Sequence, residues 1–275
     1  MVTGVLGVGL ALTLALTAVA LAVIKTTTQS ASSGDVTATF SYRGSGLGVS
    51  HARLGITRAG QVVYDRPVSS PVCHTMCGPG AFPAPAKSVR VVRLAPGGDR
   101  NVVLELYSEG ANCCFIDQVL SYAPAAHTYV KTERNFASYG AVLRRLGPRH
   151  LWRFVSGDPA FACAFTDCAD SGEPIQIWSF SGRRFHNVTR HYPKLVARDG
   201  ARWLRLFKHH LGNGVGLIAA WAADQELLGH DKRVQSTLAT QAARGHLRDG
   251  GLGAATGKGF IRQLNRLLHK LGYRR

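Results

Sequence analysis

The sequence predicts an α+β fold, in which an antiparallel, β-rich N-terminal domain is followed by an α-helical C-terminal domain. From residue 35 to residue 188, apolar and polar residues alternate in short runs separated by Gly- and Pro-containing turns, which is typical of antiparallel strands. From residue 201 onward, the apolar residues recur at helical intervals instead. A content of 45% hydrophobic residues is sufficient to form a buried core.

The clearest β signals lie early in the predicted β domain. Residues 36–42 alternate with period two, and residues 53–57 and 61–64 flank Arg58-Ala59-Gly60, which predicts a hairpin. Residues 69–87 are rich in Pro and Gly and are expected to form a loop. Further strands are expected at residues 88–94, 101–107, 118–122, 151–155, 161–165, 175–180 and 184–188.

Helical periodicity replaces the β pattern after residue 191. The apolar positions are Trp203, Leu206, Phe207 and Leu211, then Leu217, Ala220, Trp221 and Leu228, and finally Ile261, Leu264, Leu267, Leu268 and Leu271. The last helix carries Arg262, Arg266 and Lys270 on its other side. That basic face either lies on an anionic surface or is simply solvated while the apolar stripe packs on its own domain.

The N-terminal segment predicts export. Residues 2–24 are apolar and uncharged, Lys25 ends the run, and a polar stretch at residues 26–33 is expected to be a linker. A cleaved signal peptide would use Ala20-Leu21-Ala22 or a later site near Ala31, whereas an uncleaved anchor is also long enough to span a bilayer. A basic n-region is missing, and a buried core helix is the third alternative. The expected organisation is residues 1–31 as signal peptide or anchor, 32–190 as β domain and 191–275 as helical domain.

The charge balance predicts an anionic partner. Lys and Arg number 33 against 16 Asp and Glu, which gives a formal net charge of +17. Such a protein is attracted to polyanions, here an anionic cell-envelope polymer or an anionic lipid surface. Nucleic acid is not expected as a partner because the protein is exported. The alternative is that the charge only keeps an exported protein soluble.

Six cysteines fit an oxidising compartment. They fall in three pairs, Cys73/Cys77, Cys113/Cys114 and Cys163/Cys168. Outside the cytoplasm such sets form disulfides. Cys163 and Cys168 are close enough to pair locally, while the first pair either bridges to the second or leaves it to form a vicinal bond. Zinc is the rival ligand of these thiols, although the spacings are not those of a zinc ribbon or finger.

Two segments of the β domain share a strand–turn–strand plan, residues 91–107 and 141–165. Five further segments match the same family pattern: Glu109-Gly110-Ala111-Asn112-Cys113-Cys114, Pro174-Ile175-Gln176-Ile177-Trp178, Asn187-Val188-Thr189-Arg190, Ala219-Ala220-Trp221-Ala222-Ala223-Asp224-Gln225 and Leu271-Gly272-Tyr273. The chain thereby resembles exported actinobacterial proteins with repeats like β-propeller blades, related to FG-GAP and integrin-α repeats. The resemblance covers nearly all of the chain after the apolar segment and implies degenerate blade-like repeats. It implies no particular activity.

The chain departs from this family at its turns. The family's turns read Asp-Leu-Asp-Gly-Asp-Gly, whose alternate carboxylates suit calcium. Here the two turns read Arg93-Leu94-Ala95-Pro96-Gly97-Gly98 and Arg145-Leu146-Gly147-Pro148-Arg149-His150. Carboxylates are absent from both and cations replace some of them. We therefore expect no calcium there, no other metal and no cofactor, and turns held by Gly and Pro geometry.

No sequence motif identifies an enzyme. The chain has no Gly-x-Ser-x-Gly elbow, Gly257-Lys258-Gly259 lacks the spacing of a P-loop, and His209-His210 lacks a zinc-protease context. Carboxylates do cluster around the third cysteine pair, at Asp158, Asp167, Asp170 and Glu173. A pair of them at the right separation would serve glycoside hydrolysis. The simpler interpretation is that they solvate a disulfide-closed turn.

Two functional hypotheses follow. The first is an exported, non-catalytic protein that binds or scaffolds at the cell envelope, with anionic polymers as candidate ligands, either secreted or anchored to the outer face of the cytoplasmic membrane. The second is a hydrolase of cell-wall polysaccharide or peptide that uses the four acids. The hydrolase requires carboxylates that converge in a concave pocket with at least one shifted pKa. The oligomeric state is not specified by the sequence.

Overall fold

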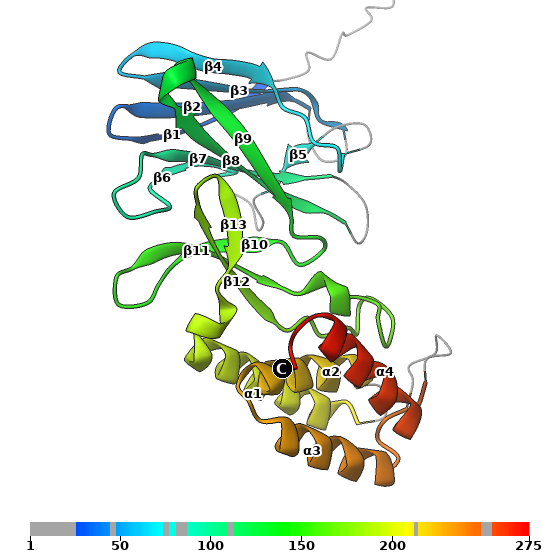
Figure 1. Cartoon of the computed structure of the whole chain (residues 1–275). Coiled ribbons are helices and arrows are strands. Elements are labelled where there is room, and N and C mark those ends of the chain that lie inside the picture. The colour runs from blue at the N-terminus through cyan, green and yellow to red at the C-terminus, as the bar shows by residue number, and fades with distance from the viewer. Residues whose placement is uncertain are drawn as a thin grey trace, which may run out of the picture.

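The computed structural model describes residues 26–44, 48–73, 77–80, 87–108, 113–211, 214–248 and 255–274. Within these ranges, three antiparallel sheets precede four α-helices, and the described strands do not close into a barrel. Figure 1 shows the sheets in chain order, followed by the helices. The α+β class is therefore confirmed. The apolar segment at residues 2–24 lies outside the described residues, and none of the described helices is long and apolar enough to cross a membrane.

The first sheet is a meander of four strands in sequence order. They are β1 (Thr26–Ser33), β2 (Val36–Arg43), β3 (Ser50–Arg58) and β4 (Gln61–Pro67). The predicted hairpin is the β3–β4 connection, where Ala59 and Gly60 have φ values of 49° and 79°. Positive φ at both central residues is the requirement of a type I′ hairpin turn, which matches the twist of the two strands.

The stretch expected to be a polar linker is the edge strand β1. It pairs with β2 along its whole length, from Thr26 opposite Arg43 to Ser33 opposite Val36. It also contacts the segment that leads into the second sheet, because the Gln29 Oε1 accepts a hydrogen bond of 2.7 Å from the Ser88 backbone N–H. Composition alone suggested a linker, but an edge strand needs no apolar face toward solvent, and cross-strand pairing decides its structure.

The second sheet has five strands in the order β5-β7-β8-β9, with β6 also paired to β7. They are β5 (Gly78–Pro79), β6 (Val89–Val92), β7 (Asn101–Tyr107), β8 (Phe115–Ala123) and β9 (Thr128–Asn135). Its apolar side chains Leu104, Leu106 and Ile116 share one core with Phe40 and Ile56 of the first sheet. The two sheets therefore pack face to face.

The third sheet is again a four-stranded meander. It consists of β10 (Ala141–Leu146), β11 (Leu151–Gly157), β12 (Ile175–Ser181) and β13 (Arg184–Asn187). The prediction of a strand at residues 161–165 is wrong. Asp158 instead starts a short 3₁₀ turn over Pro159–Phe161, with its Oδ1 accepting a hydrogen bond of 3.0 Å from the Ala160 N–H. Proline lacks an N–H for a strand ladder and is well suited to such a turn.

A separate apolar cluster joins the second sheet to the third. We call it the inter-sheet cluster; its buried members are Leu94, Val103, Val119, Phe136, Leu143, Phe154 and Phe180. The rings of Phe154 and Phe136 stack with centroids 6.1 Å apart, and the Phe185 ring meets Phe154 edge-on at 5.2 Å. Such aromatic contacts fix the relative position of the two sheets more specifically than aliphatic burial alone.

The helical part consists of α1 (Pro193–His209), α2 (Val215–Leu227), α3 (Asp231–Ala243) and α4 (Gly257–Lys270). α2 is buried on nearly all sides and lies at the centre of the helical core, together with Trp203 and Phe207 of α1 and Phe260 of α4. Phe161 and Phe165 join this core from the loop after β11. Helix α3 had no counterpart among the expected helices.

Each cysteine pair forms a disulfide within its own segment. The pairs are Cys73–Cys77, Cys113–Cys114 and Cys163–Cys168. The bridge from the first pair to the second, which the sequence allowed, is not formed; the vicinal alternative is present, and the Cys73–Cys77 bond was not among the expected pairings. Cys77 and Cys114 nevertheless lie in the same core between the first two sheets. With all six sulfurs engaged, the thiolates required by the zinc alternative are not available.

Strand β1 is expected to contribute to stability although it is polar. A chain beginning at Ser32 loses most of the β1–β2 ladder, and each net hydrogen bond lost costs about 1 kcal/mol. We expect its thermal unfolding midpoint to lie several degrees below that of a chain beginning at Thr26, as measured by circular dichroism. A chain beginning at Thr28 is the control because it loses only two residue pairs. Equal midpoints for all three chains would show that β1 is dispensable.

Candidate functional site

A groove lies between two turns of neighbouring sheets. It has a volume of about 510 Å³ and lies between the β6–β7 connection and the β10–β11 hairpin, which project from the same side of the molecule in Figure 1. We call it the arginine groove. Its charged and aromatic lining residues are Arg93, Arg100, Arg145, Arg149, His150 and Trp152.

The first wall of the arginine groove is the turn at residues 93–100. Leu94 anchors it, since this side chain is buried in the inter-sheet cluster and the Leu94 N–H donates to the Asn101 Oδ1 at 3.4 Å. The turn then reverses at Gly97, where φ is 68°, a conformation that favours glycine. Burial of Leu94 directs the chain so that its neighbour Arg93 is exposed at the groove.

The second wall is the β10–β11 hairpin. Arg145 and Trp152 are cross-strand partners, and the Arg145 guanidinium lies 4.9 Å from the centre of the Trp152 ring. The hairpin closes through a hydrogen bond of 3.0 Å from the His150 N–H to the Gly147 carbonyl, with Gly147 at φ 71°. Stacking of this kind orients the guanidinium while leaving its N–H edge free to bind.

The positive charge of the groove is largely uncompensated. No Asp or Glu lines it, and the ion pairs among the described residues include none that involves Arg93, Arg145 or Arg149. Arg100 differs, because its Nε donates to the Ser33 Oγ at 3.1 Å and its Nη1 lies 3.7 Å from the Asp35 carboxylate. Three arginines are therefore available to a ligand and one braces the groove against β1 and the following turn.

The arrangement is suited to binding an anion with several charged groups. A guanidinium donates two parallel hydrogen bonds to a phosphate or a carboxylate, and the two walls offer such groups from opposite sides. Trp152 adds an apolar ring beside them. Sequence inspection showed that cations replace carboxylates in both turns, but it did not show that the two turns meet.

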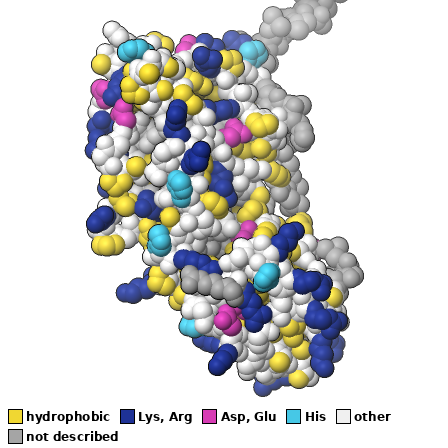
Figure 2. Space-filling model, viewed as in Figure 1, with side chains coloured by type: hydrophobic (Ala, Val, Ile, Leu, Met, Phe, Trp, Pro, Cys, Tyr) yellow, Lys and Arg dark blue, Asp and Glu magenta, His cyan; other side chains and the backbone are white. Residues whose placement is uncertain are grey.

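The rest of the surface also favours binding of anions. Among the residues that the structure describes, the buried charged ones are all acids, namely Asp117, Asp158, Glu173, Asp224 and Glu226. No Lys or Arg of the described residues is buried to the same degree. Figure 2 shows Lys and Arg side chains over the sheets and gathered along the part of the surface over α3 and α4. The exposed surface is thus more basic than the net charge of the chain suggests.

Of the four acids in the predicted acidic site, Asp158 and Glu173 lie close enough to interact. Burial raises the pKa of Glu173 to about 7, with the Asp158 charge adding to the shift. Asp167 lies within the loop closed by Cys163–Cys168 and Asp170 lies just after it, and the Asp170 N–H donates to the Asp167 Oδ1 at 2.9 Å. The Asp167 carboxylate therefore supports a local turn, to which Asp170 contributes its backbone N–H.

The paired acids do not converge in one pocket. Asp158 borders a cavity of about 350 Å³, but its Oδ2 accepts a hydrogen bond of 2.8 Å from the buried Tyr273 hydroxyl. Glu173 does not line that cavity, and its Oε1 receives only the Ser138 hydroxyl, at 3.3 Å. The hydrolase hypothesis expects convergent carboxylates, and each of the described cavities is lined by at most one of these four residues.

Other acids that are buried or largely buried were not predicted as site residues. Asp199 on α1 accepts hydrogen bonds from the Ile175 N–H at 3.1 Å and from the Trp203 ring N–H at 2.8 Å, which ties the third sheet to the helices. Burial, and then the Asp199 charge, raise the pKa of neighbouring Asp224 well above its usual range. The available signal was an acid within an apolar helix, since Asp224 follows a run of buried alanines.

A second pair lies on the second sheet. Glu105 and Asp117 are opposite each other on β7 and β8, and the Arg90 Nε lies 3.1 Å from the Glu105 Oε1. Burial raises the pKa of both carboxyls. Within the described ranges, no three or more His, Cys, Asp or Glu side chains form a group able to hold a metal ion.

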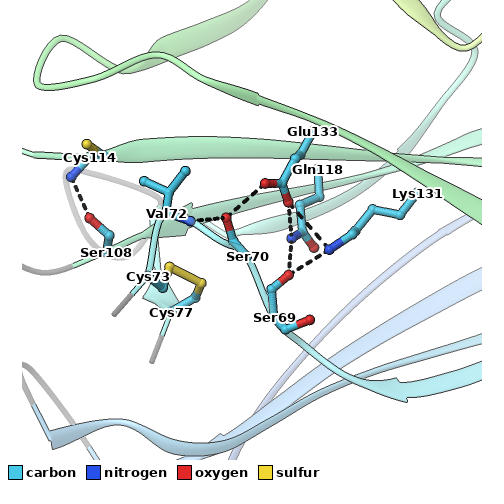
Figure 3. The surroundings of a disulfide bond; sticks show 10 residues. All are labelled: Ser69, Ser70, Val72, Cys73, Cys77, Ser108, Cys114, Gln118, Lys131 and Glu133. Carbon is cyan, nitrogen blue, oxygen red and sulfur yellow. Dashed lines mark hydrogen bonds and ion pairs between the residues drawn. A yellow bond between two sulfur atoms is a disulfide. The ribbon is translucent and has the colours of Figure 1, made fainter. Parts of the chain in front are cut away.

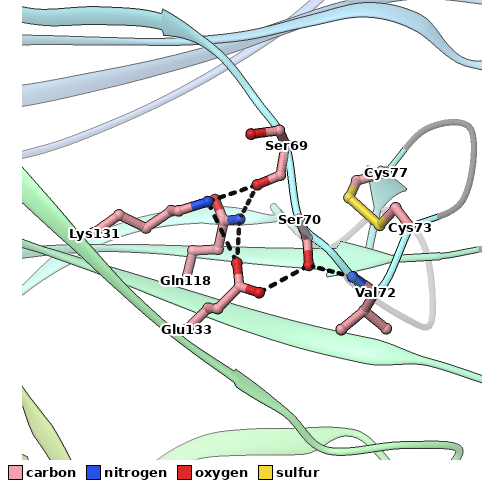
Figure 4. Close-up of polar contacts among 8 residues, drawn as sticks. All are labelled: Ser69, Ser70, Val72, Cys73, Cys77, Gln118, Lys131 and Glu133. Carbon is pink, nitrogen blue, oxygen red and sulfur yellow. Dashed lines mark hydrogen bonds and ion pairs between the residues drawn. A yellow bond between two sulfur atoms is a disulfide. The ribbon is translucent and has the colours of Figure 1, made fainter.

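A polar network supports the Cys73–Cys77 loop. Figures 3 and 4 show Glu133 of β9 at its centre, accepting hydrogen bonds from the Ser70 hydroxyl at 2.9 Å and from the Gln118 amide at 3.0 Å. Lys131 donates to the Ser69 carbonyl at 2.7 Å and lies 3.4 Å from Glu133. These contacts tie the described residues before the Cys73–Cys77 disulfide to strands β8 and β9.

The raised pKa of Glu173 predicts a pH-dependent stability. Its folded-state pKa of about 7 lies above the ordinary 4.5, so the stabilisation is complete below pH 4.5 and is lost as the pH rises through 7. Glu173→Gln keeps the neutral form at every pH. We therefore expect the unfolding midpoint of the variant, relative to the unmodified protein, to rise by a few degrees between pH 5 and pH 8, both taken as rough limits of the transition.

Asp170→Asn is the matched control, because this exposed acid belongs to the same loop. Its difference from the unmodified protein should stay constant over the same pH range. A Glu173→Gln difference that is equally flat would show that Glu173 is ionised in the folded protein throughout.

Comparison of the chain with protein-family models, with curated proteins and with solved structures finds no match in any of the three.

Proposed function

We propose that this protein is exported and binds an anionic polymer of the cell envelope, without catalysing a reaction, through the arginine groove. The observation that carries the proposal is that Arg93, Arg100, Arg145 and Arg149 line one groove that no acid lines. Such a cluster is costly to hold together without a ligand, because like charges repel. A ligand with repeated phosphates or carboxylates offsets that repulsion at several points simultaneously.

Three further features support the proposal. The disulfides fit an oxidising compartment outside the cytoplasm. The buried acids leave a basic surface that steers a polyanion toward the groove. The first and third sheets are meanders of four strands in sequence order, which is consistent with degenerate blade-like repeats, whereas the second sheet has five strands and departs from that plan.

The proposal predicts that groove arginines matter more than net charge. The double variant Arg145→Ala/Arg149→Ala should bind a soluble polyphosphate at least about tenfold more weakly, since each removes a charge-assisted contact. Isothermal titration over a series of salt concentrations gives both the affinity and its salt dependence. Removing bound arginines should also flatten the dependence of the affinity on salt.

The control is Arg144→Ala/Arg184→Ala, which removes the same charge from exposed arginines outside the groove. Arg144 neighbours Arg145 on β10, and successive side chains on a strand point to opposite faces. The control should reduce binding less than twofold, in rough terms, because distant surface charges are screened. Equal losses in both double variants would show that diffuse charge, not the groove, holds the polymer.

A further inference from the structure

A second groove lies in the helical domain, away from the arginine groove. It has a volume of about 480 Å³ and is formed by α1, the end of α2 and the start of α3. We call it the helical groove. It is lined by Ala197, Ala201, Leu204, Arg205, Lys208, His209, Trp221, Gln225, Leu228, His230 and Arg233.

One part of the helical groove is apolar. Trp221 is 1% exposed, and Leu204 and Leu228 are half-buried beside it. Ala197 and Ala201 lie one turn apart on the exposed side of α1. Their short side chains leave open the space that longer residues at these positions would cover. The result is an apolar channel along α1 that water contacts in the absence of a ligand.

The other part is cationic. Arg205, Lys208 and Arg233 are exposed at the groove, and no ion pair among the described residues involves any of them. The His230 ring is fixed beside them by a contact of 3.0 Å between its Nδ1 and the Gln225 Oε1. Positive side chains from two different helices therefore line the same groove as the apolar residues.

We propose that the helical groove binds a single anionic amphiphile, with its acidic head on Arg205, Lys208 and Arg233 and its acyl chain beside Trp221. An uncharged chain would leave the cations without a partner, and a free inorganic anion would leave the apolar channel in contact with water. Only a ligand that has both parts satisfies the whole lining. This site is independent of the polymer-binding groove and adds an acidic lipid to the partners of the protein.

The probe for this proposal is dodecyl phosphate below its micelle-forming concentration, titrated calorimetrically into the full-length protein. Inorganic phosphate and the uncharged dodecyl maltoside supply the head and the chain separately. Because the apolar N-terminal segment can also bind an alkyl chain, the affinity of the groove is taken from the difference between variants. Dodecyl phosphate should bind at least about tenfold more tightly than either comparison compound.

Two variants address the two parts of the groove. Ala201→Leu fills the apolar channel with a good helix former and leaves the charge unchanged. Arg205→Gln/Arg233→Gln removes two of the three cations and leaves the channel open. Each should weaken dodecyl phosphate binding by about tenfold or more, with the circular dichroism spectrum and unfolding midpoint unchanged. Arg198→Gln, on the same exposed side of α1 but outside the lining, is the control and should bind as the unmodified protein does.

Three results would overturn the proposal. Unchanged binding of dodecyl phosphate by Ala201→Leu would place the alkyl chain elsewhere. Equal affinity for inorganic phosphate would reduce the site to a simple anion site. Binding to phosphatidylglycerol vesicles that none of the groove variants weakens, together with no groove-dependent binding of monomeric dodecyl phosphate, would replace the site with non-specific attraction to a lipid surface.

Discussion

The inter-sheet cluster is the contact on which the arginine groove depends. Leu94 belongs to the first arginine-bearing turn, Leu143 to the strand that leads into the second, and both are buried in this cluster. Two unit charges 4 Å apart in water repel by about 1 kcal/mol, whereas burying one large apolar side chain contributes about 1.5–3 kcal/mol. Packing of the cluster therefore outweighs the repulsion between the turns and holds the arginines together before any ligand arrives.

The fold was predictable where local pattern and tertiary environment agree. The β3–β4 hairpin combines period-two strands with a short turn, and it forms as expected. The predictions of secondary structure failed where contacts between distant segments determine the conformation. Strand β1 is polar on both faces and is specified by its pairing with β2, while α3 buries only Val234 and Leu238, too few positions to give a helical period. At residues 161–165 the apolar side chains do bury, but on the helices and from a turn.

The sites were less predictable than the fold because each depends on distance between segments. The sequence placed cations in two separate turns, but only the packing of the second sheet on the third brings them to one groove. For the acids, the sequence predicted one site from residues that the fold does not bring together. Asp167 and Asp170 are close to Asp158 in sequence, yet they lie within and just after the turn that the Cys163–Cys168 disulfide closes. Proximity along the chain is a poor guide to a site when a loop lies between two cores.

The two grooves share a physical origin in the way the chain separates its charges. In the helical part, Asp224 and Glu226 are buried and Asp199 is largely so, which leaves Asp231 as the exposed acid among the described residues there. Burial favours the neutral form of these acids, so they subtract little from the positive field outside. A surface built in this way attracts anions over its whole extent. Discrimination among them must come from shape: facing turns for a polymer, an apolar channel for an amphiphile.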